Sequence, residues 1–165
     1  LSRLRSVFKE NGTVTAGTAS GVVDGACALV MMKEEEAKKR NLRIMGSLVS
    51  WGHAGVSPDR MGYGPVPSSE KALSAAGCSV KDLKRVEINE AFVPQYIAVE
   101  KGLNLNRDIT NSWGGATAIG HPLGATGSRL TLTCLRQLKI LDGGGLGLIS
   151  MCIGGGQGIS LIVEV

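Results

Sequence analysis

Short apolar stretches alternate with helical patterns along most of this chain, and this alternation limits the folds that it can adopt. The predicted strands span residues 43–51, 83–89, 109–113, 146–151 and 159–165, and the predicted helices span 69–76, 91–101 and 127–141. Helices between strands imply crossover connections and a mostly parallel sheet, to which the closing hairpin adds one antiparallel strand. The order βαβαβαββ therefore predicts an α/β fold, with a mixed five-stranded sheet and helices on both faces.

The last predicted helix has an apolar stripe that is too wide for packing on one sheet alone. The stripe consists of Leu130, Leu132, Cys134, Leu135, Leu138, Ile140 and Leu141. We therefore expect this helix to be covered on both sides, by another part of the protein or by a partner subunit.

The first 41 residues differ in character from the rest. Residues 12–21 are small, polar and rich in glycine, which is typical of a loop whose backbone approaches another group closely. A strand is predicted at 27–32, and the run 34–40 places acids four residues before bases, as exposed helices do. We interpret this charged helix as a boundary between a unit at 1–41 and a domain at 42–165.

Composition and charge argue against several classes of function. The net charge of +4 is scattered among 165 residues without a basic and aromatic cluster, which argues against nucleic-acid binding and suits a small anionic ligand. The four cysteines are widely spaced, which argues against a zinc site or a disulfide framework. No stretch is long enough to span a bilayer. Because the chain starts at Leu1 without a methionine or a signal sequence, we expect it to be a piece of a longer soluble protein.

A glycine-rich loop at 114–124 presents a single imidazole. His121 precedes Pro122, and a residue before proline is restricted to extended backbone, so the ring is held on a loop. A loop histidine taken alone is more often a surface group than a catalytic one. His53 has no comparable surroundings, and we assign it no role.

A second glycine-rich loop follows Cys152. This thiol stands at a strand end before residues 154–156, whose N–H groups can lower a thiol pKa or hold an oxyanion. Asn89 also ends a strand, where its amide either caps the next helix or fixes a water or ligand oxygen beside His121. Ligands of such sheets gather at strand ends. The other cysteines, which are expected to pack as small apolar residues, are Cys27 in a strand, Cys78 in a turn and Cys134 in a helix.

Three motifs in these regions resemble those of the thiolase family in order and spacing. They are Asn-Glu-Ala-Phe at 89–92, Gly-Gly-x-x-x-x-Gly-His-Pro-x-Gly at 114–124 and Cys-x-Gly-Gly-Gly-x-Gly at 152–158. The resemblance extends from about Gly12 to Val165. It implies a thiolase-like C-terminal half, in which 1–41 is the end of the thiolase N-terminal half and 42–165 is the C-terminal domain. Thiolases cleave 3-ketoacyl-CoA with CoA, or run the reverse Claisen condensation, through an acyl-cysteine intermediate.

The resemblance also implies a role for each site residue. His121 activates the nucleophilic cysteine and helps to hold the thioester oxygen, while Asn89 anchors a water beside that oxygen. Cys152 moves the proton at the substrate α-carbon or the leaving thiol, and Gly154 offers an N–H to a second oxyanion hole. The positions that match the wall of the CoA pantetheine channel are Ala16, Ser20, Met61, Ala91 and Phe92. We expect no metal and no permanently bound cofactor, with coenzyme A as a substrate.

Two features depart from the family pattern. The nucleophilic cysteine of thiolases lies in the N-terminal half, and no other cysteine here has its surroundings, so the chain alone is expected to be inactive. Trp113 and Thr18 replace asparagines that the family usually has. An indole beside Gly114 is expected to strain or reshape the histidine loop.

The resemblance favours the degradative 3-ketoacyl-CoA thiolases of mitochondria as the first hypothesis. The alternatives are a biosynthetic acetoacetyl-CoA thiolase and a non-catalytic acyl-CoA-binding or lipid-binding protein with the thiolase fold. Pure binding does not need Asn89, His121 and Cys152 together, which disfavours the last alternative. The resemblance further implies a homodimer or homotetramer in the mitochondrial matrix, with the cytosol or peroxisome as other locations.

Overall fold

The apolar stretches of the sequence form a four-stranded mixed sheet in the computed structural model, which describes residues 1–165. The strands are β1 (Ser47–Gly55), β2 (Leu83–Ile88), β3 (Leu146–Ile153) and β4 (Gln157–Glu164), and their order in the sheet is β1-β4-β3-β2. β4 pairs antiparallel with both β1 and β3, whereas β3 pairs parallel with β2. The predicted single antiparallel strand is thus β4, which lies inside the sheet.

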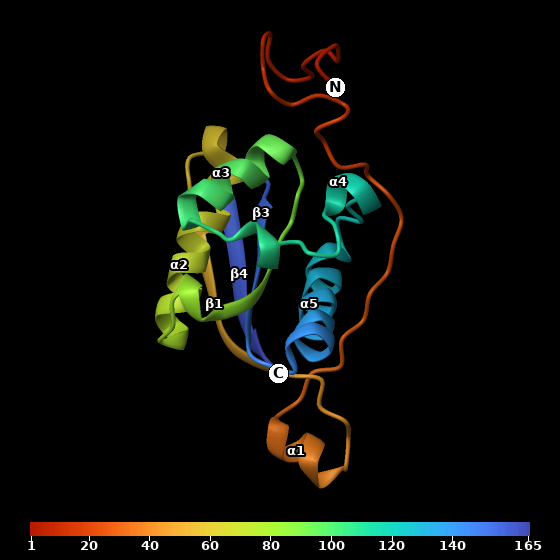
Figure 1. Cartoon of the computed structure of the whole chain (residues 1–165), viewed down its shortest axis with the longest axis vertical. Coiled ribbons are helices and arrows are strands. Elements are labelled where there is room, and N and C mark those ends of the chain that lie inside the picture. Colours follow the sequence, from red (N-terminus) through yellow and green to blue (C-terminus); the bar gives the residue numbers. More distant parts are fainter.

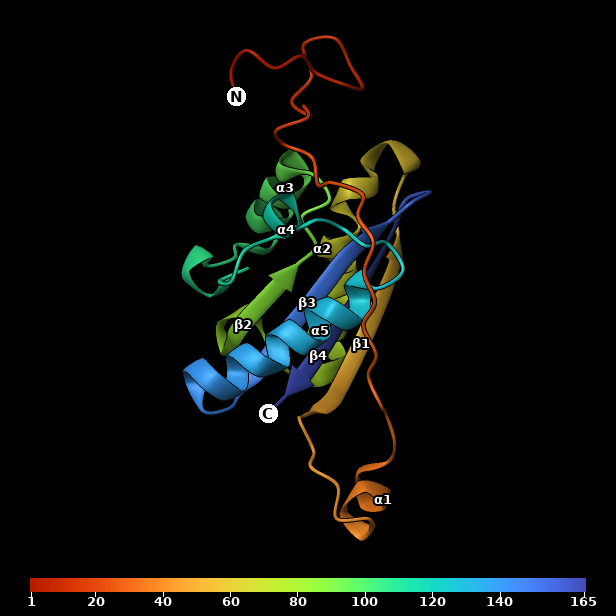
Figure 2. The same cartoon turned by 90° about the vertical axis from the view of Figure 1, so that its right-hand side faces the viewer.

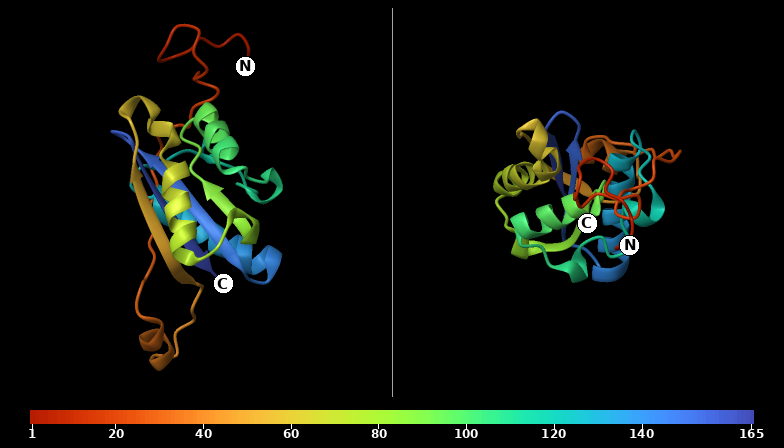
Figure 3. Two further views of the ribbon diagram at one scale, coloured as in Figure 1. Left: turned by 90° about the vertical axis from the view of Figure 1, so that its left-hand side faces the viewer. Right: turned by 90° about the horizontal axis from the view of Figure 1, so that it is seen from above.

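Helices cover both faces of this sheet, as predicted (Figures 1 and 2). On one face, α2 (Pro65–Ala76) and α3 (Val93–Leu103) build the larger core, in which Leu73 and Val99 pack with Leu148. On the other face, α5 (Thr126–Gln137) packs Leu130 and Leu135 against the sheet in a smaller core. The left view of Figure 3 shows α2, in yellow-green, in front of the sheet, and α3, in green, above the end of β2. This arrangement leaves the carboxyl ends of β1, β2 and β3 at one edge.

Buried serines let α2 approach the sheet closely. Ser160 of β4 lies 2.7 Å from the hydroxyl of Ser68, 3.0 Å from that of Ser69 and 2.7 Å from that of Ser150. At the amino end of α2, a Cβ on Gly158 would lie 2.1 Å from the backbone of Gly64, so only glycine fits there. The start of β4, directly after the cysteine loop, is therefore held by backbone contact.

The remaining elements are short. They are α1 (Glu34–Lys39), α4 (Ala116–Ile119), the 3-10 helices Pro58–Tyr63, Val80–Asp82 and Arg107–Ile109, and a π-helical turn at Leu138–Asp142. α1 lies apart from the sheet in Figures 1 and 2. It carries the ion pairs Glu34–Lys38 and Glu36–Arg40, which confirms the predicted exposed charged helix.

Two predicted strands are wrong, and the sheet has four strands instead of five. Residues 109–113 begin in a 3-10 helix, and Thr110 makes only a single parallel bridge to Val86. Asn111 then adopts a left-handed conformation with φ 48°, which turns the chain away from the sheet. Residues 27–32, including Cys27, run without pairing to any strand, because no strand of this chain lies beside them. The helix predicted at 127–141 is present as α5, and its last turn, Leu138–Asp142, is π-helical.

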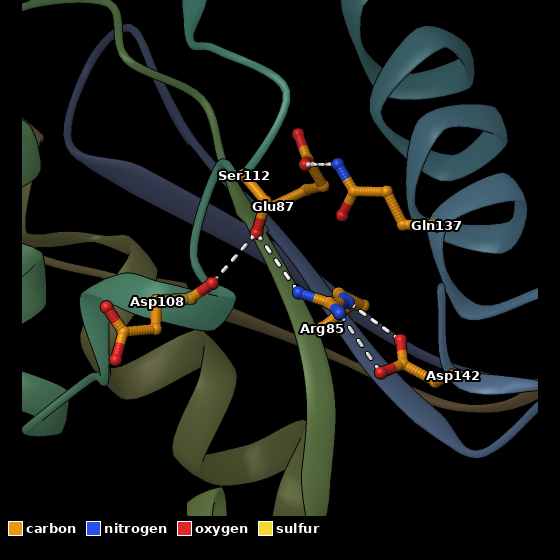
Figure 4. A network of polar contacts seen from close by, with 6 residues as sticks. All are labelled: Arg85, Glu87, Asp108, Ser112, Gln137 and Asp142. Atoms are coloured by element: carbon orange, nitrogen blue, oxygen red, sulfur yellow. Dashed lines mark hydrogen bonds and ion pairs between the residues drawn. The ribbon is translucent and has the colours of Figure 1, made fainter. Parts of the chain in front are cut away.

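A partly buried ion pair joins β2 to the turn before β3. Arg85 donates to both carboxylate oxygens of Asp142 at 2.7 and 3.0 Å, and also to the hydroxyl of Ser112 at 3.2 Å (Figure 4). Ser112 in turn donates to the carbonyl of Asp108 at 3.2 Å. Arg85 therefore ties the π-helical turn after α5 and the segment after Thr110 to β2.

Glu87 is a carboxyl group buried between β2 and α5. Its side chain accepts a hydrogen bond from Gln137 at 2.9 Å (Figure 4), while Oε2 is buried without a partner. The residue is 1% exposed. Burial raises the pKa of Glu87 to about 7, although the bond from Gln137 and the charge of Arg129 oppose the shift.

This shift predicts a pH-dependent stability. The pKa of Glu87 is 4.5 in its ordinary state and about 7 in the folded protein. The contribution of the protonated side chain to the free energy of unfolding is therefore complete below pH 4.5 and is lost as the pH rises through 7. The loss amounts to about 3 kcal/mol. Glu87→Gln should remove this part of the pH dependence and should be more stable than the natural chain at pH 8, as measured by urea unfolding at pH 5 and pH 8. The exposed Glu164→Gln is the matched control and should keep the original pH profile. An unchanged slope in Glu87→Gln would contradict the assignment.

Candidate active site

The structure brings Asn89 and His121 into contact. The Asn89 side chain, 1% exposed, lies just beyond β2, and its Nδ2 is 3.3 Å from Nε2 of His121. The backbone of Asn89 donates to the carbonyl of Ser150 at 2.8 Å, and His121 N donates to the carbonyl of Gly21 at 2.8 Å. Two strands and the loop near residue 21 therefore fix the amide and the imidazole relative to each other.

Thr126 orients the imidazole and was not identified from the sequence. Its hydroxyl lies 2.7 Å from Nδ1 of His121 and donates to the carbonyl of Pro122 at 3.0 Å. A hydroxyl has one proton, so Thr126 accepts from Nδ1–H and leaves a lone pair on Nε2. The residue is 0% exposed, so water does not compete for this hydrogen bond. The only sequence signal was a hydroxyl five residues after the histidine.

Burial, and after it the positive charge of Arg129, lowers the pKa of the His121 imidazole below its ordinary value of 6.5. The ring is therefore neutral at pH 7. With Nδ1–H committed to Thr126, Nε2 is the nitrogen that can accept a proton.

Cys152 lies near the carboxyl end of β3, opposite Gly158 of β4. Burial raises the pKa of its thiol, so the sulfur is protonated at neutral pH. Because Asn89 N is bonded to the carbonyl of Ser150, two residues before Cys152, both residues belong to the same sheet edge. No hydrogen bond joins Cys152 to Asn89 or His121.

Gly154 leaves open space beside the thiol. A Cβ at this position would have no heavy atom within 4 Å, and its N–H donates to no backbone carbonyl. The next two glycines have φ of 83° and 92°, which other residues rarely adopt. This turn can therefore offer a free N–H to an oxygen atom beside Cys152.

The other cysteines do not share these surroundings. Cys134 is 0% exposed on α5, and burial raises the pKa of its thiol strongly. Burial also raises the pKa of Cys78, just beyond α2. Cys27 is partly exposed in extended backbone.

Three of the residues predicted to line the CoA channel lie together. Ser20 donates to the carbonyl of Ala91 through its N–H and its hydroxyl, both at 3.0 Å, and Ala19 forms an antiparallel bridge with Phe92. Ala16 is exposed and Met61 is partly buried in the 3-10 helix Pro58–Tyr63, and neither is bonded to this group.

Phe8 joins this group and was not identified from the sequence. Its ring packs edge-on against Phe92, with centroids 5.8 Å apart and planes at 86°. The signal was an apolar aromatic residue just before the small polar stretch. The pair adds an apolar surface beside Ser20 and Ala91.

The two departures at Thr18 and Trp113 are accommodated. Thr18 accepts from Thr15 N at 2.8 Å, and its carbonyl accepts from Val93 N at 2.8 Å, which ties the loop to α3. The indole of Trp113 is 47% exposed, and the contact between Asn89 and His121 forms in its presence. Glu90 accepts from Thr117 N at 3.0 Å and so anchors α4 within the histidine loop.

None of the helices is both long and apolar enough to cross a membrane.

Comparison with known protein families gives two matches. The family described as "Thiolase, C-terminal domain" matches residues 42–165, and "Thiolase, N-terminal domain" matches residues 1–35. Among curated relatives, the beta-ketothiolase BktB of Cupriavidus necator is 51% identical over 165 residues, which are 99% of this chain and 42% of that protein. The mitochondrial 3-ketoacyl-CoA thiolase of Homo sapiens is 49% identical over 99% of this chain and 41% of its own length. An acetyl-CoA acetyltransferase of Rhizobium meliloti is also 49% identical, over 99% of this chain and 42% of its own.

Solved structures of such proteins have the same fold. The human mitochondrial 3-ketoacyl-CoA thiolase in complex with CoA superposes with a TM-score of 0.95 at 49% identity, over 99% of this chain and 41% of that one. The acetyl-CoA acetyltransferase of Bacillus anthracis also gives 0.95, at 44% identity and the same coverage. The chain thus spans 41% to 42% of the length of these relatives. Over that span, the sequence motifs, the fold and the family matches agree, and the chain belongs to the thiolase family.

Proposed function

We propose that this chain forms the C-terminal part of a thiolase that transfers acyl groups between 3-ketoacyl-CoA and CoA through a cysteine acyl-enzyme. The observation that carries the proposal is the neutral His121, whose Nε2 is held by Asn89 while Thr126 occupies Nδ1. Cys152 belongs to the same sheet edge. The names of the relatives, which are thiolases and acetyl-CoA acetyltransferases, support this chemistry.

In the first step, His121 accepts the proton of the nucleophilic thiol, and the thiolate attacks the substrate carbonyl. Once Nε2 carries a proton, it no longer accepts from Asn89 and is free to donate to the carbonyl oxygen. The buried Oδ1 of Asn89 has no partner in the protein and is suited to hold a water next to that oxygen. His121 and the water then share the charge that develops on the oxygen.

In the next step, the bond between the α- and β-carbons breaks and leaves an acyl-enzyme and the enolate of the shorter acyl-CoA. Cys152 donates its thiol proton to the α-carbon, and the N–H of Gly154 holds the enolate oxygen. The resulting Cys152 thiolate takes the proton of the incoming CoA thiol. The CoA sulfur then attacks the carbonyl of the acyl-enzyme. This step transfers the acyl group to CoA, as the second acyl-CoA product, and frees the nucleophilic thiolate. A raised pKa at Cys152 suits this donation, because the thiol is protonated before the bond breaks.

The nucleophile itself is proposed to come from the part of the protein that corresponds to the rest of the relatives' length. Cys134 is fully buried, and Cys78 lies beyond α2, away from the glycine loops. Neither of them, nor Cys27, lies in a glycine-rich turn.

We place the pantetheine arm of CoA along Ser20, Ala91 and Phe92, with Ala16 and Met61 on the same wall. Phe8 extends this wall because it packs on Phe92. The positive net charge of +4 favours the approach of the anionic nucleotide end of CoA. No permanently bound cofactor is part of this proposal.

The degradative direction, as in fatty-acid β-oxidation, and the mitochondrial matrix are supported by the mitochondrial 3-ketoacyl-CoA thiolases among the relatives. The acetyl-CoA acetyltransferase of Rhizobium meliloti favours the condensation direction as the second candidate. Exposed apolar residues on β1, Leu48, Val49 and Trp51, support burial against another part of the protein or a partner copy in a dimer or tetramer.

A chimera tests the proposed function. The chain is joined to the preceding part of the human mitochondrial 3-ketoacyl-CoA thiolase, in place of the region that it matches. We expect thiolysis of acetoacetyl-CoA by the chimera and none by the purified chain alone, because only the chimera supplies the nucleophile. Formation of acetyl-CoA is measured by chromatography. Thiolysis by the chain alone, or a folded chimera that binds CoA without turnover, would overturn the proposal.

A further inference from the structure

The backbone runs alongside β2, the outermost strand on that side of the sheet, and turns away from it at Asn111. Thr110 forms a parallel bridge with Val86, and Asn111 N donates to the carbonyl of Val86 at 2.8 Å. Asn111 then takes a left-handed conformation with φ 48°, and the chain turns toward the histidine loop. Asparagine tolerates this conformation better than most residues that carry a side chain.

The side chain of Asn111 continues the pairing that the backbone abandons. Its Oδ1 accepts from Ile88 N at 2.9 Å, and its Nδ2 donates to Ile88 O at 2.9 Å. A parallel strand running on at this point would offer Ile88 one carbonyl and one N–H. A carboxamide has the same two groups in one plane, so it replaces the missing peptide units.

This arrangement connects the two halves of the candidate site. Ile88 directly precedes Asn89, and Asn111 begins the segment that leads to His121. We propose that Asn111 is a positioning residue, whose carboxamide locks the end of β2 to the segment that leads into the histidine loop (114–124) and so holds the Asn89 amide against the His121 imidazole. The importance of this contact for catalysis rests on the proposed function, whereas the contact itself does not.

A neighbouring restraint supplies a matched control. Ser112, the next residue, is linked to Arg85 at 3.2 Å, and Arg85 is paired with Asp142 (Figure 4). This link holds the same segment to β2 but does not reach Ile88. If any tether between this segment and β2 were enough to position His121, loss of the Ser112 link and loss of the Asn111 link would have similar effects on His121.

The test uses the isotope-labelled 165-residue chain and nuclear magnetic resonance, without any acyl-CoA. Asn111→Gly keeps the left-handed backbone and removes the carboxamide. We expect hydrogen exchange at Ile88 N–H to accelerate by about tenfold or more. We also expect the Nε2 signal of His121 to shift, because it loses the hydrogen bond from Asn89, together with a shift of the Asn89 side-chain amide signals. Ser112→Ala should leave all three readouts unchanged.

If Asn111→Gly fails to fold, Asn111→Asp tests the proposal in its place. It keeps the side-chain size and an acceptor for Ile88 N, but it presents an oxygen to Ile88 O and should disturb His121 in the same way. Faster exchange at Ile88 with unchanged His121 and Asn89 signals would overturn the proposal, as would an equal effect of Ser112→Ala. Because no substrate is present, failure of the thiolysis assay would leave this result intact.

Discussion

Replacing His121 by alanine in the chimeric thiolase should lower kcat for acetoacetyl-CoA thiolysis by about 10³-fold. In the proposed mechanism, the imidazole is the base, and the structure shows that Thr126 and Asn89 hold it in a single orientation with Nε2 as the acceptor. Its loss removes both the base for the nucleophile and a donor to the carbonyl oxygen. Initial rates over a range of substrate concentrations separate kcat from KM, and we expect the main effect on kcat.

His53→Ala is the matched control for this variant. His53 is exposed on β1, and its imidazole makes no hydrogen bond, while its backbone carbonyl accepts from Lys71 at 3.1 Å. Its removal should leave the rate unchanged. In the unmodified chimera, kcat/KM should fall as the pH drops through a value below 6.5, because burial lowers the pKa of His121 and the protonated ring cannot act as a base. A rate within about threefold of the parent in His121→Ala would contradict the catalytic role.

Replacing Cys152 by alanine in the same chimera should lower kcat by about 10²-fold to 10⁴-fold. Without this thiol, no group is placed to protonate the α-carbon or to receive the proton of CoA. KM for acetoacetyl-CoA should change little, since the proposed pantetheine wall at Ser20, Ala91 and Phe92 is untouched. Steady-state kinetics give both constants.

Cys78→Ala is the control for Cys152, because Cys78 is also a partly buried thiol with a raised pKa but lies beyond α2. Its activity should match that of the parent. Alkylation adds a second distinction: the nucleophilic cysteine of the Cys152→Ala variant should still react with iodoacetamide. Full turnover by Cys152→Ala would remove this residue from the mechanism.

The sequence predicted the α/β fold and the sheet edge at which the site lies, because both follow from periodicity. Asn89 and Cys152 end neighbouring parallel strands, so a mixed sheet with crossover helices already places them together. The contact between Asn89 and His121 required the fold, since the two residues are 32 positions apart. Their roles came from the family motifs and not from periodicity.

The strand predicted at 109–113 shows where periodicity is insufficient. The apolar pattern near Ile109 favours a strand, yet the pairing with β2 is completed by the Asn111 side chain instead of the backbone. No local pattern distinguishes a side-chain amide from a peptide amide in that role. Thr126 could not be identified from the sequence for a related reason. A hydroxyl in the first turn of a helix is common, and only the fold shows that this one lies beside an imidazole.

The central place of β4 has a consequence for how the molecule folds. β4 is the last of the four strands along the sequence, yet it supplies the pairing partner of β1 and one partner of β3. β1 therefore stays without a neighbour until more than a hundred further residues have been synthesised, as the register Ser47 with Glu164 indicates. Such distant pairing delays closure of the sheet and leaves an unpaired strand during synthesis, which is the stage at which chains of this topology are most exposed to aggregation.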